Sequence, residues 1–193
     1  TIAPELVVFG ELSSTNTFAV RALSSGTVLD ISENFVEGGR VEQGDLIVKI
    51  DPRDAQSARD RIAADLRDAE AEARDAERAL ALERDELAAA LQQAELRQQA
   101  LTRQNDLVSR GVGTAAAVET AQLALSGATQ AVLSRRQAQA QAQARLDQAA
   151  TRLDRARLNL ADANRTVADT EIRAPFSGTL ANVSIAKGVR VTA

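Results

Sequence analysis

The sequence contains no histidine, cysteine, methionine, tryptophan or tyrosine. It therefore lacks an imidazole base and a thiolate, the side chains behind most general-base catalysis and most soft metal sites. The missing Met and His also argue against a copper or silver chaperone. Carboxylates are plentiful, but they are spread along helical sequence and no pattern draws two of them into a pocket. We expect no enzyme, no catalytic residue, no metal and no cofactor.

Aromatic residues are limited to four phenylalanines, all near the ends of the chain: Phe9, Phe18, Phe35 and Phe176. A sheet core therefore has to lie in the terminal segments, and the middle must pack with aliphatic side chains alone. Ala, Gln, Arg, Glu and Leu dominate residues 54–169, which is typical of long helices or coiled coils.

The net charge of -4, with acidic residues and Arg interspersed, argues against a nucleic-acid partner. No apolar run approaches the roughly 20 residues that a membrane-spanning helix needs. The sequence has no methionine and begins at Thr1, so we interpret it as a piece of a longer protein. Any membrane attachment is then expected outside this piece.

An internal repeat brackets the helical region. Residues 21–28, RALSSGTV, recur as residues 173–180, RAPFSGTL, and both copies continue to a second glycine turn at 36–38 and 186–188. Alternating residues with glycine punctuation predict short strands and tight turns. Because a single two-stranded unit is marginal in water, we expect the two copies to pack together as halves of one small β domain.

A long helix is predicted to begin directly after the first copy. Residues 41–50 read as a turn and a mostly apolar strand, and Asp51 then suits the N-cap position while Pro52 suits the first helical position.

The helical region has a coiled-coil heptad pattern. Its second half has one row at Val118, Leu125, Val132, Gln139, Leu146, Leu153, Leu160 and Val167, and a second at Ala121, Ala128, Arg135, Ala142, Ala149, Ala156 and Ala163. Its first half has one row at Leu66, Ala73, Leu80, Leu87, Ala94 and Leu101, and a second at Ile62, Ala69, Ala76, Glu83, Ala90 and Arg97. The short segment 110–114, RGVGT, forces the two helices to be antiparallel, with Gly111 ending the first and Thr114 capping the second.

Split glycine-punctuated halves around a heptad hairpin, with the second half opening on residues 172–178, IRAPFSG, resemble the periplasmic adaptor subunits, or membrane fusion proteins, of bacterial efflux pumps. The resemblance covers nearly the whole chain. It implies an α+β fold in which a long antiparallel coiled-coil hairpin is inserted into a split lipoyl-like, or barrel-sandwich hybrid, β domain.

The resemblance also implies a division of the chain. Residues 1–19 would be strand material from the β-barrel or membrane-proximal region, 20–51 the first lipoyl-like half, 52–169 the hairpin with its tip at about 103–114, and 170–193 the second half.

The tip matches the family more closely. Adaptors that engage TolC-like channels resemble one another in an Arg, a Leu four residues later and a Ser seven further on, and here Arg103, Leu107 and Thr114 stand at those spacings, with threonine replacing serine. With Gly111 and Val112 of the loop they form our candidate channel-binding tip. Each also has a plainer interpretation: Arg103 as a solvated charge, Leu107 as packing at the hairpin end, and Thr114 as a helix cap.

By resemblance the chain is expected in the periplasm, anchored to the inner membrane in the full-length protein. It would link an inner-membrane transporter, of the resistance-nodulation-division (RND) type or else an ABC exporter, to a TolC-like outer-membrane channel for drug or small-molecule efflux. It would self-associate into a ring, a hexamer in relatives. Two alternatives of another class are a structural coiled-coil scaffold, which explains the heptads but not the repeat, and a lipoyl or biotinyl carrier. Against the carrier, neither of the two lysines, Lys49 and Lys187, lies at the junctions 51–52 and 169–170, where the modified lysine would sit.

Overall fold

The computed structural model describes residue 9 and residues 17–192. These divide into two compact units, which we describe separately. One consists of the terminal segments, up to Pro52 and from Ala168 onward, and the other is Arg53–Val167. The fold class expected from the sequence, a long hairpin inserted into a split β domain, is confirmed.

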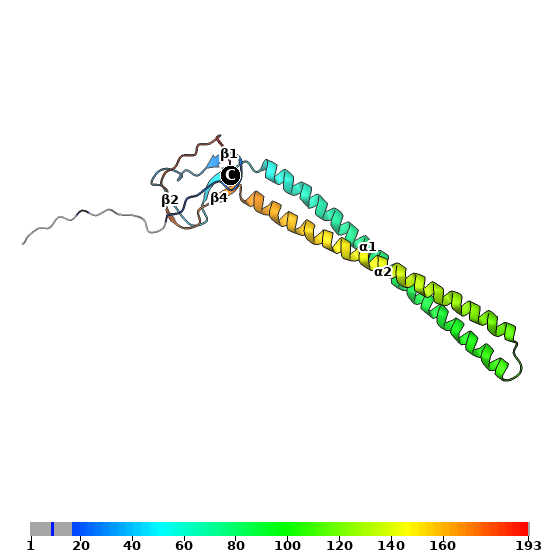
Figure 1. Cartoon of the computed structure of the whole chain (residues 1–193). Helices are drawn as coiled ribbons and strands as arrows, with labels where there is room; N and C mark the ends of the chain where they lie inside the picture. Colours follow the sequence, from blue (N-terminus) through cyan, green and yellow to red (C-terminus); the bar gives the residue numbers. More distant parts are fainter. Residues whose placement is uncertain (1–8, 10–16, 193) are drawn as a thin grey trace, which may run out of the picture. The chain divides into compact units, whose positions relative to one another are not determined.

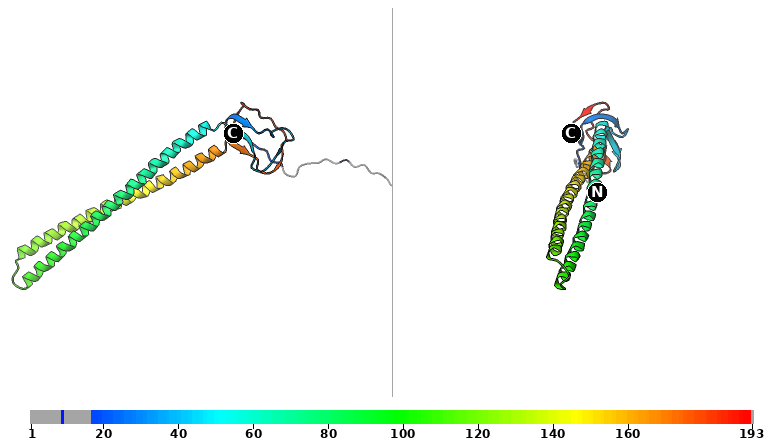
Figure 2. Two further views of the ribbon diagram at one scale, coloured as in Figure 1. Left: turned by 180° about the vertical axis from the view of Figure 1, so that it is seen from behind. Right: turned by 90° about the vertical axis from the view of Figure 1, so that its right-hand side faces the viewer.

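The hairpin consists of α1, Arg53–Ser109, and α2, Ala115–Ala168 (Figure 1). Both further views show the helices antiparallel and side by side along their length (Figure 2). Helix α1 begins at Arg53, one residue after the predicted first helical position at Pro52. At about 1.5 Å of rise per residue, each arm is roughly 80 Å long.

The heptad seam predicted from the sequence is the buried side of the hairpin. Its most buried members are Leu80, Val132, Ala142, Ala149, Ala156 and Ala163. Four polar residues interrupt the apolar heptad rows. Arg97 and Arg135 are exposed, whereas Glu83 and Gln139 are half-buried. The apolar rows therefore hold the hairpin together, and the arginines leave the seam.

Two ion pairs cross between the helices. Arg135 pairs with Glu86 and Arg152 pairs with Glu72. Exposed pairs of this kind contribute about 0 to 1 kcal/mol each, so they add little to the seam. They do show the alignment, because residue 86 lies level with residue 135 and residue 72 with residue 152.

The β unit is built from six short strands, all paired antiparallel. They are β1 Gly26–Ile31, β2 Arg40–Val41, β3 Leu46–Ile50, β4 Glu171–Arg173, β5 Gly178–Thr179 and β6 Arg190–Val191. One sheet has the order β4-β3-β1-β6, and β2 and β5 form a second.

The two copies of the repeat exchange strands. Gly26 of β1 lies opposite Val191 of β6, and in the same way Gly178 of β5 lies opposite Val41 of β2. The turns repeat this exchange: the Gly38 amide donates to the Leu180 carbonyl at 2.9 Å and the Gly188 amide donates to the Val28 carbonyl at 2.9 Å. Each copy therefore supplies the hydrogen-bonding partner of the other, and the expected packing of the two halves is confirmed.

The core of the β unit lies in the terminal segments, as expected, but it is aliphatic rather than aromatic. Its buried residues are Val28, Val41, Ile47, Val48, Ile50, Ile172 and Ala174. Of the phenylalanines, only Phe35 packs against this cluster. Phe18 and Phe176 are both exposed, and their rings contact each other edge to face with 6.4 Å between the ring centroids.

The expectation for residues 1–19 falls mostly outside the described residues. Residues 17–19, the end of that segment that the structure describes, have no regular secondary structure.

An ion pair connects the halves at Asp30 and Lys187, whose Nζ donates to the Asp30 carboxylate at 3.2 Å. This hydrogen bond, aided by one from the Ile31 amide and by the charge of Lys187, holds the pKa of Asp30 below its ordinary value. Because the pKa is lowered in the folded state, the pair stabilises the fold above about pH 4 and loses its effect as pH falls through the folded pKa.

We therefore expect Lys187→Gln to lower the free energy of unfolding at about pH 7, by a small amount, and to have a smaller effect at about pH 2, because the Asp30 carboxylate loses its charge as pH falls through its folded pKa. Hydrogen exchange of the β1 amides, which reports the free energy of unfolding, measures this change at the two pH values. An equal loss at both values would contradict the assignment.

Candidate functional site

The tip loop is built by a Schellman motif at the end of α1. The Val112 amide donates to the Leu107 carbonyl at 3.1 Å and the Gly111 amide donates to the Val108 carbonyl at 2.9 Å. These are the 6→1 and 5→2 hydrogen bonds that satisfy the last carbonyls of a helix. The motif needs a left-handed residue after the helix, and Gly111 supplies it with φ of 78°.

A second glycine in the loop is required for a different reason. A Cβ on Gly113 would lie 2.7 Å from the Val108 backbone nitrogen and 3.0 Å from the Leu107 carbonyl carbon. The loop folds back onto the end of α1 so closely that no side chain fits there. Because Gly113 has no side chain, the loop backbone can pack directly against the last turn of α1.

Thr114 is the N-cap of α2, as the sequence predicted. The Ala117 amide donates to its Oγ1 at 3.3 Å, and its backbone carbonyl accepts from the amides of Ala117 and Val118. Its hydroxyl is exposed and keeps its own proton to donate outward.

The structure places the other candidate residues on the surface of the hairpin end. Arg103 and Leu107 stand one turn apart on α1, and Val112 stands at the top of the loop. Arg103 is exposed and has no ion pair among the described residues. Leu107 is 40% exposed and Val112 is 73% exposed, so the tip presents apolar side chains to solvent beside the exposed cations of Arg103 and Arg110.

Two residues were not among the candidates predicted from the sequence. Val108 is 39% exposed next to Leu107 and enlarges the apolar surface. Gly113 shapes the loop; the Gly-x-Gly spacing of residues 111–113 was the available signal, but only the backbone contact with Val108 shows why it is needed.

Gly113→Ala is expected to destabilise the hairpin end by about 1 to 3 kcal/mol, because backbone atoms cannot move away as a flexible side chain can. The matched control is Gly127→Ala, since nothing lies within 4 Å of the added Cβ and alanine favours a helix interior. That variant should gain up to about 1 kcal/mol. Thermal unfolding followed by circular dichroism compares them, and equal effects would contradict the tight-loop assignment.

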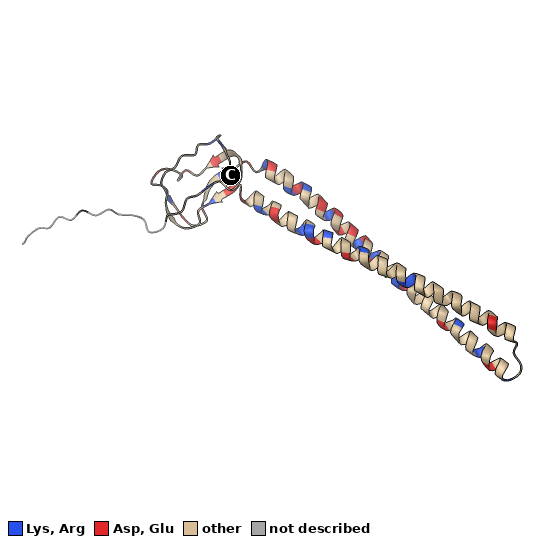
Figure 3. Ribbon diagram, in the orientation of Figure 1, with Lys and Arg blue, Asp and Glu red and all other residues tan. Residues whose placement is uncertain are grey.

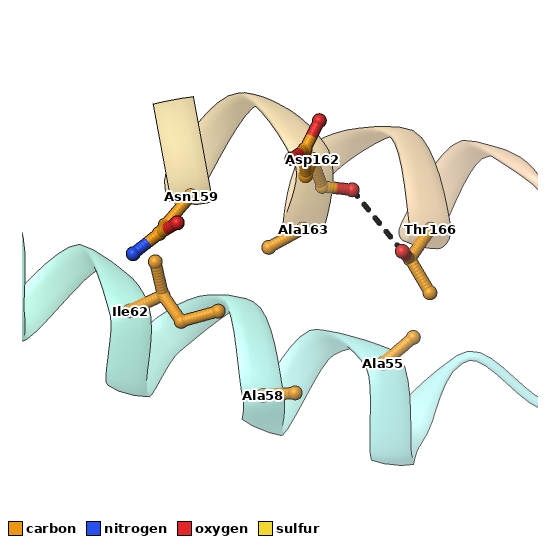
Figure 4. A pocket seen from close by; sticks show the side chains of 7 residues that line it. All are labelled: Ala55, Ala58, Ile62, Asn159, Asp162, Ala163 and Thr166. Atoms are coloured by element: carbon orange, nitrogen blue, oxygen red, sulfur yellow. Dashed lines mark hydrogen bonds between the residues drawn. The ribbon is translucent and has the colours of Figure 1, made fainter. Parts of the chain in front are cut away.

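A hollow between the helices offers no comparable chemistry. It has a volume of about 310 Å³ and lies between the start of α1 and the end of α2 (Figure 4). Its lining residues are Ala55, Ala58, Ile62, Asn159, Asp162, Ala163 and Thr166. The Thr166 hydroxyl donates to the Asp162 carbonyl, so it is already satisfied within the helix. Among the described residues no cluster of acidic side chains could hold a metal ion.

Comparison with known families decides what kind of protein this is. Residues 16–193 match the model for the barrel-sandwich hybrid domain of RND membrane fusion proteins. The chain belongs to the membrane fusion protein family. Membrane fusion proteins are the periplasmic adaptors of efflux systems, and they are transport components rather than enzymes. No curated protein sequence matches the chain.

Solved structures of membrane fusion proteins are similar to it at low identity. The periplasmic adaptor protein EmrA is 15% identical over 87% of this chain and 66% of its own, with a TM-score of 0.39. MacA from Actinobacillus actinomycetemcomitans is 20% identical over 93% of this chain and 46% of its own, with a TM-score of 0.49. The soluble domain of LipC, a membrane fusion protein of a type I secretion system, is 14% identical over 92% of this chain and 96% of its own, with a TM-score of 0.48.

The present chain thus spans less than two thirds of the length of EmrA and about half of MacA. Neither α1 nor α2, the helices in the described part of this membrane fusion protein, is long and apolar enough to cross a membrane.

Proposed function

We propose that this membrane fusion protein links an inner-membrane RND transporter to a TolC-like outer-membrane channel and that the hairpin tip is its channel-binding site. The observation that carries the proposal is the exposed set of Arg103 and Leu107 at the end of α1 and Val112 on the loop, whose backbone is held by the Schellman motif and by Gly113. The matching family model, which is one of RND adaptors, supports the choice of transporter.

The tip suits a helical partner. Leu107 and Val112 offer apolar area that gains about 25 cal/mol for each Å² removed from water. Arg103 offers a fork of donors to carbonyl or carboxylate oxygens. Thr114 offers a hydroxyl donor at the start of α2 while its oxygen caps the helix. Because the loop is preorganised by Gly111 and Gly113, little conformational entropy is lost on binding.

The proposed mechanism is mechanical. The transporter supplies the energy, and several copies of the adaptor, six by resemblance, form a ring that seals the path for drugs or other small molecules. The long arms of the hairpin, 57 and 54 residues, act as stiff spacers. Attachment to the inner membrane is proposed through parts of the full-length protein outside this sequence.

An ABC exporter is the second candidate for the transporter, and the length of the hairpin favours it. Co-purification of the full-length protein with its inner-membrane partner after mild crosslinking separates the two. Recovery of an ATP-binding subunit would replace the RND assignment while leaving the tip assignment intact.

Photocrosslinking tests the tip directly. A photoreactive amino acid at Val112 should capture the outer-membrane channel in cells. The same photoreactive residue at Leu158, which is 66% exposed against 73% for Val112 but lies far from the tip on α2, should not. Capture from Leu158 with none from Val112 would overturn the proposed site. A lipoyl or biotinyl adduct on Lys49, detected by mass spectrometry, would point to a carrier instead.

A further inference from the structure

One carboxylate oxygen is buried without a hydrogen-bond partner in the middle of the hairpin. Among the described side chains, Glu83 Oε2 is the single carboxylate oxygen in this situation. Glu83 belongs to the seam row of α1 that contains Ala76 and Ala90, so it stands where the other members of the row pack against α2. A buried oxygen that receives no hydrogen bond destabilises the packing around it, because it has lost its contact with water and gained no donor in return.

The residue of α2 at the same level is also polar. Counting from the ion pair between Glu86 and Arg135, Gln139 of α2 lies level with Glu83 of α1. Both residues are half-buried, and Gln139 donates no hydrogen bond to Glu83 Oε2. Within the described hairpin this is the one level at which a polar residue interrupts the predicted seam rows of both helices. We call Glu83 and Gln139 the polar layer.

The seam is apolar on both sides of the polar layer. Leu80, on the side away from the loop, is 3% exposed, and Val132, on the side toward the loop, is 6% exposed. Between them Arg135 also holds a position in a seam row, but its side chain is exposed and pairs with Glu86 instead of entering the seam. The hairpin therefore consists of two apolar stretches that are joined at a polar layer.

Charged side chains surround the polar layer. Figure 3 shows both helices crowded with charge up to this level, over residues 53–87 and 135–168, and sparsely charged beyond it. A small separation of the helices here lets water hydrate the Glu83 carboxylate, whereas the same separation at Leu80 exposes apolar surface. Opening the seam therefore costs less free energy at the polar layer than in the apolar stretches beside it.

We propose that the polar layer is a joint at which the distal hairpin, residues 84–138, bends relative to the arms 53–82 and 140–168. The two apolar stretches stay packed while the layer between them opens and closes. Because the layer lies about 28 residues from the loop, roughly 42 Å along the helix, a bend of about 10° moves the tip sideways by roughly 7 Å. The inference goes beyond the proposed function, since it concerns motion within the hairpin whatever the tip binds.

Spin labels on α2 measure the bend, and the chain has no native cysteine to interfere. Leu123→Cys with Leu158→Cys places two labels at exposed positions of one helix row, on either side of the polar layer. A straight helix sets them about 52 Å apart, and double electron–electron resonance should show a broad distribution that extends to shorter distances. Adding Glu83→Leu with Gln139→Leu should narrow the distribution to about half its width, because apolar contacts then close the seam.

The matched control adds the same apolar atoms outside the seam. Glu77→Leu with Gln137→Leu changes an exposed glutamate and an exposed glutamine close to the polar layer. This variant should leave the width of the distance distribution unchanged, because neither side chain lies between the helices.

Hydrogen exchange locates the joint along the chain. In the wild type, the backbone amides of residues 80–86 and 136–142 should exchange about tenfold faster than those around Ala149, a buried position of the apolar seam. Glu83→Leu with Gln139→Leu should remove this difference, since the seam is then apolar throughout.

A narrow distance distribution in the wild type would overturn the joint, as would equal widths in the wild type and in the variant with leucine at 83 and 139. Protection of the amides that falls in the leucine variant would also overturn it, because the layer would then fix the register of the helices instead of loosening them. Neither measurement uses a channel or a transporter, so the joint and the proposed tip function can fail independently.

Discussion

Leu107→Ser is expected to abolish export while leaving the protein folded. The side chain is 40% exposed at the end of α1, and only its backbone carbonyl takes part in the Schellman motif. Serine therefore keeps the loop and removes the apolar contact, at an expected loss of about 1 kcal/mol of binding to the channel for each copy of the adaptor, because less than half of the Leu107 side chain is exposed to a partner. At equal expression, cells should accumulate the drug or other substrate as if the adaptor were deleted.

The matched control is Leu158→Ser, since Leu158 is more exposed than Leu107 and lies far from the tip along α2. It should leave export unchanged. Arg103→Asp should resemble Leu107→Ser, because it reverses the charge that Arg103 offers to the channel. Full export by both tip variants, at normal helicity and expression, would remove the tip from the mechanism.

Ile50→Ala is expected to cause the largest loss of stability, about 2 to 5 kcal/mol in the β unit. Ile50 is fully buried, and its Cγ2 lies 2.6 Å from the position that a Cβ on Gly26 would occupy, so β1 and β3 meet there without spare room. Alanine leaves a cavity that the paired strands cannot close. Leu29→Ala, at a position of β1 that is 41% exposed, is the control and should cost well under about 1 kcal/mol.

Intrinsic fluorescence cannot report this change, because the chain has no tryptophan or tyrosine. Hydrogen exchange of the amides of β1 and β3 measures it, while the helical circular dichroism signal reports the hairpin, whose seam contains none of these residues. Unchanged protection of β1 and β3 in Ile50→Ala would contradict the core assigned to Val28, Val48 and Ile50.

The sequence predicted the hairpin well because its signals are local and periodic. Apolar and alanine rows at heptad spacing must face a partner helix, and a five-residue break containing two glycines leaves only an antiparallel neighbour. Residues such as Leu80 and Ala149 are buried as their rows require. Even the interruptions followed the pattern, since Arg97 and Arg135 remain exposed.

The β unit was predictable in outline only. The repeat indicated two equivalent halves, yet repeats alone do not say whether each half pairs within itself or with its mate. The pairing of Gly26 with Val191 and of Gly178 with Val41 joins residues more than a hundred positions apart, and no local propensity encodes such a register. The phenylalanines suggested where the core lies but not its composition.

The amino-acid sequence by itself determined the length and direction of the helices, the position of the loop and the N-cap at Thr114, because caps, glycines and heptads act within a few residues. Only the tertiary structure decided the exchange of strands between the halves and the need for Gly113. Those features depend on which distant backbone atoms come into contact, and that depends on packing the whole chain.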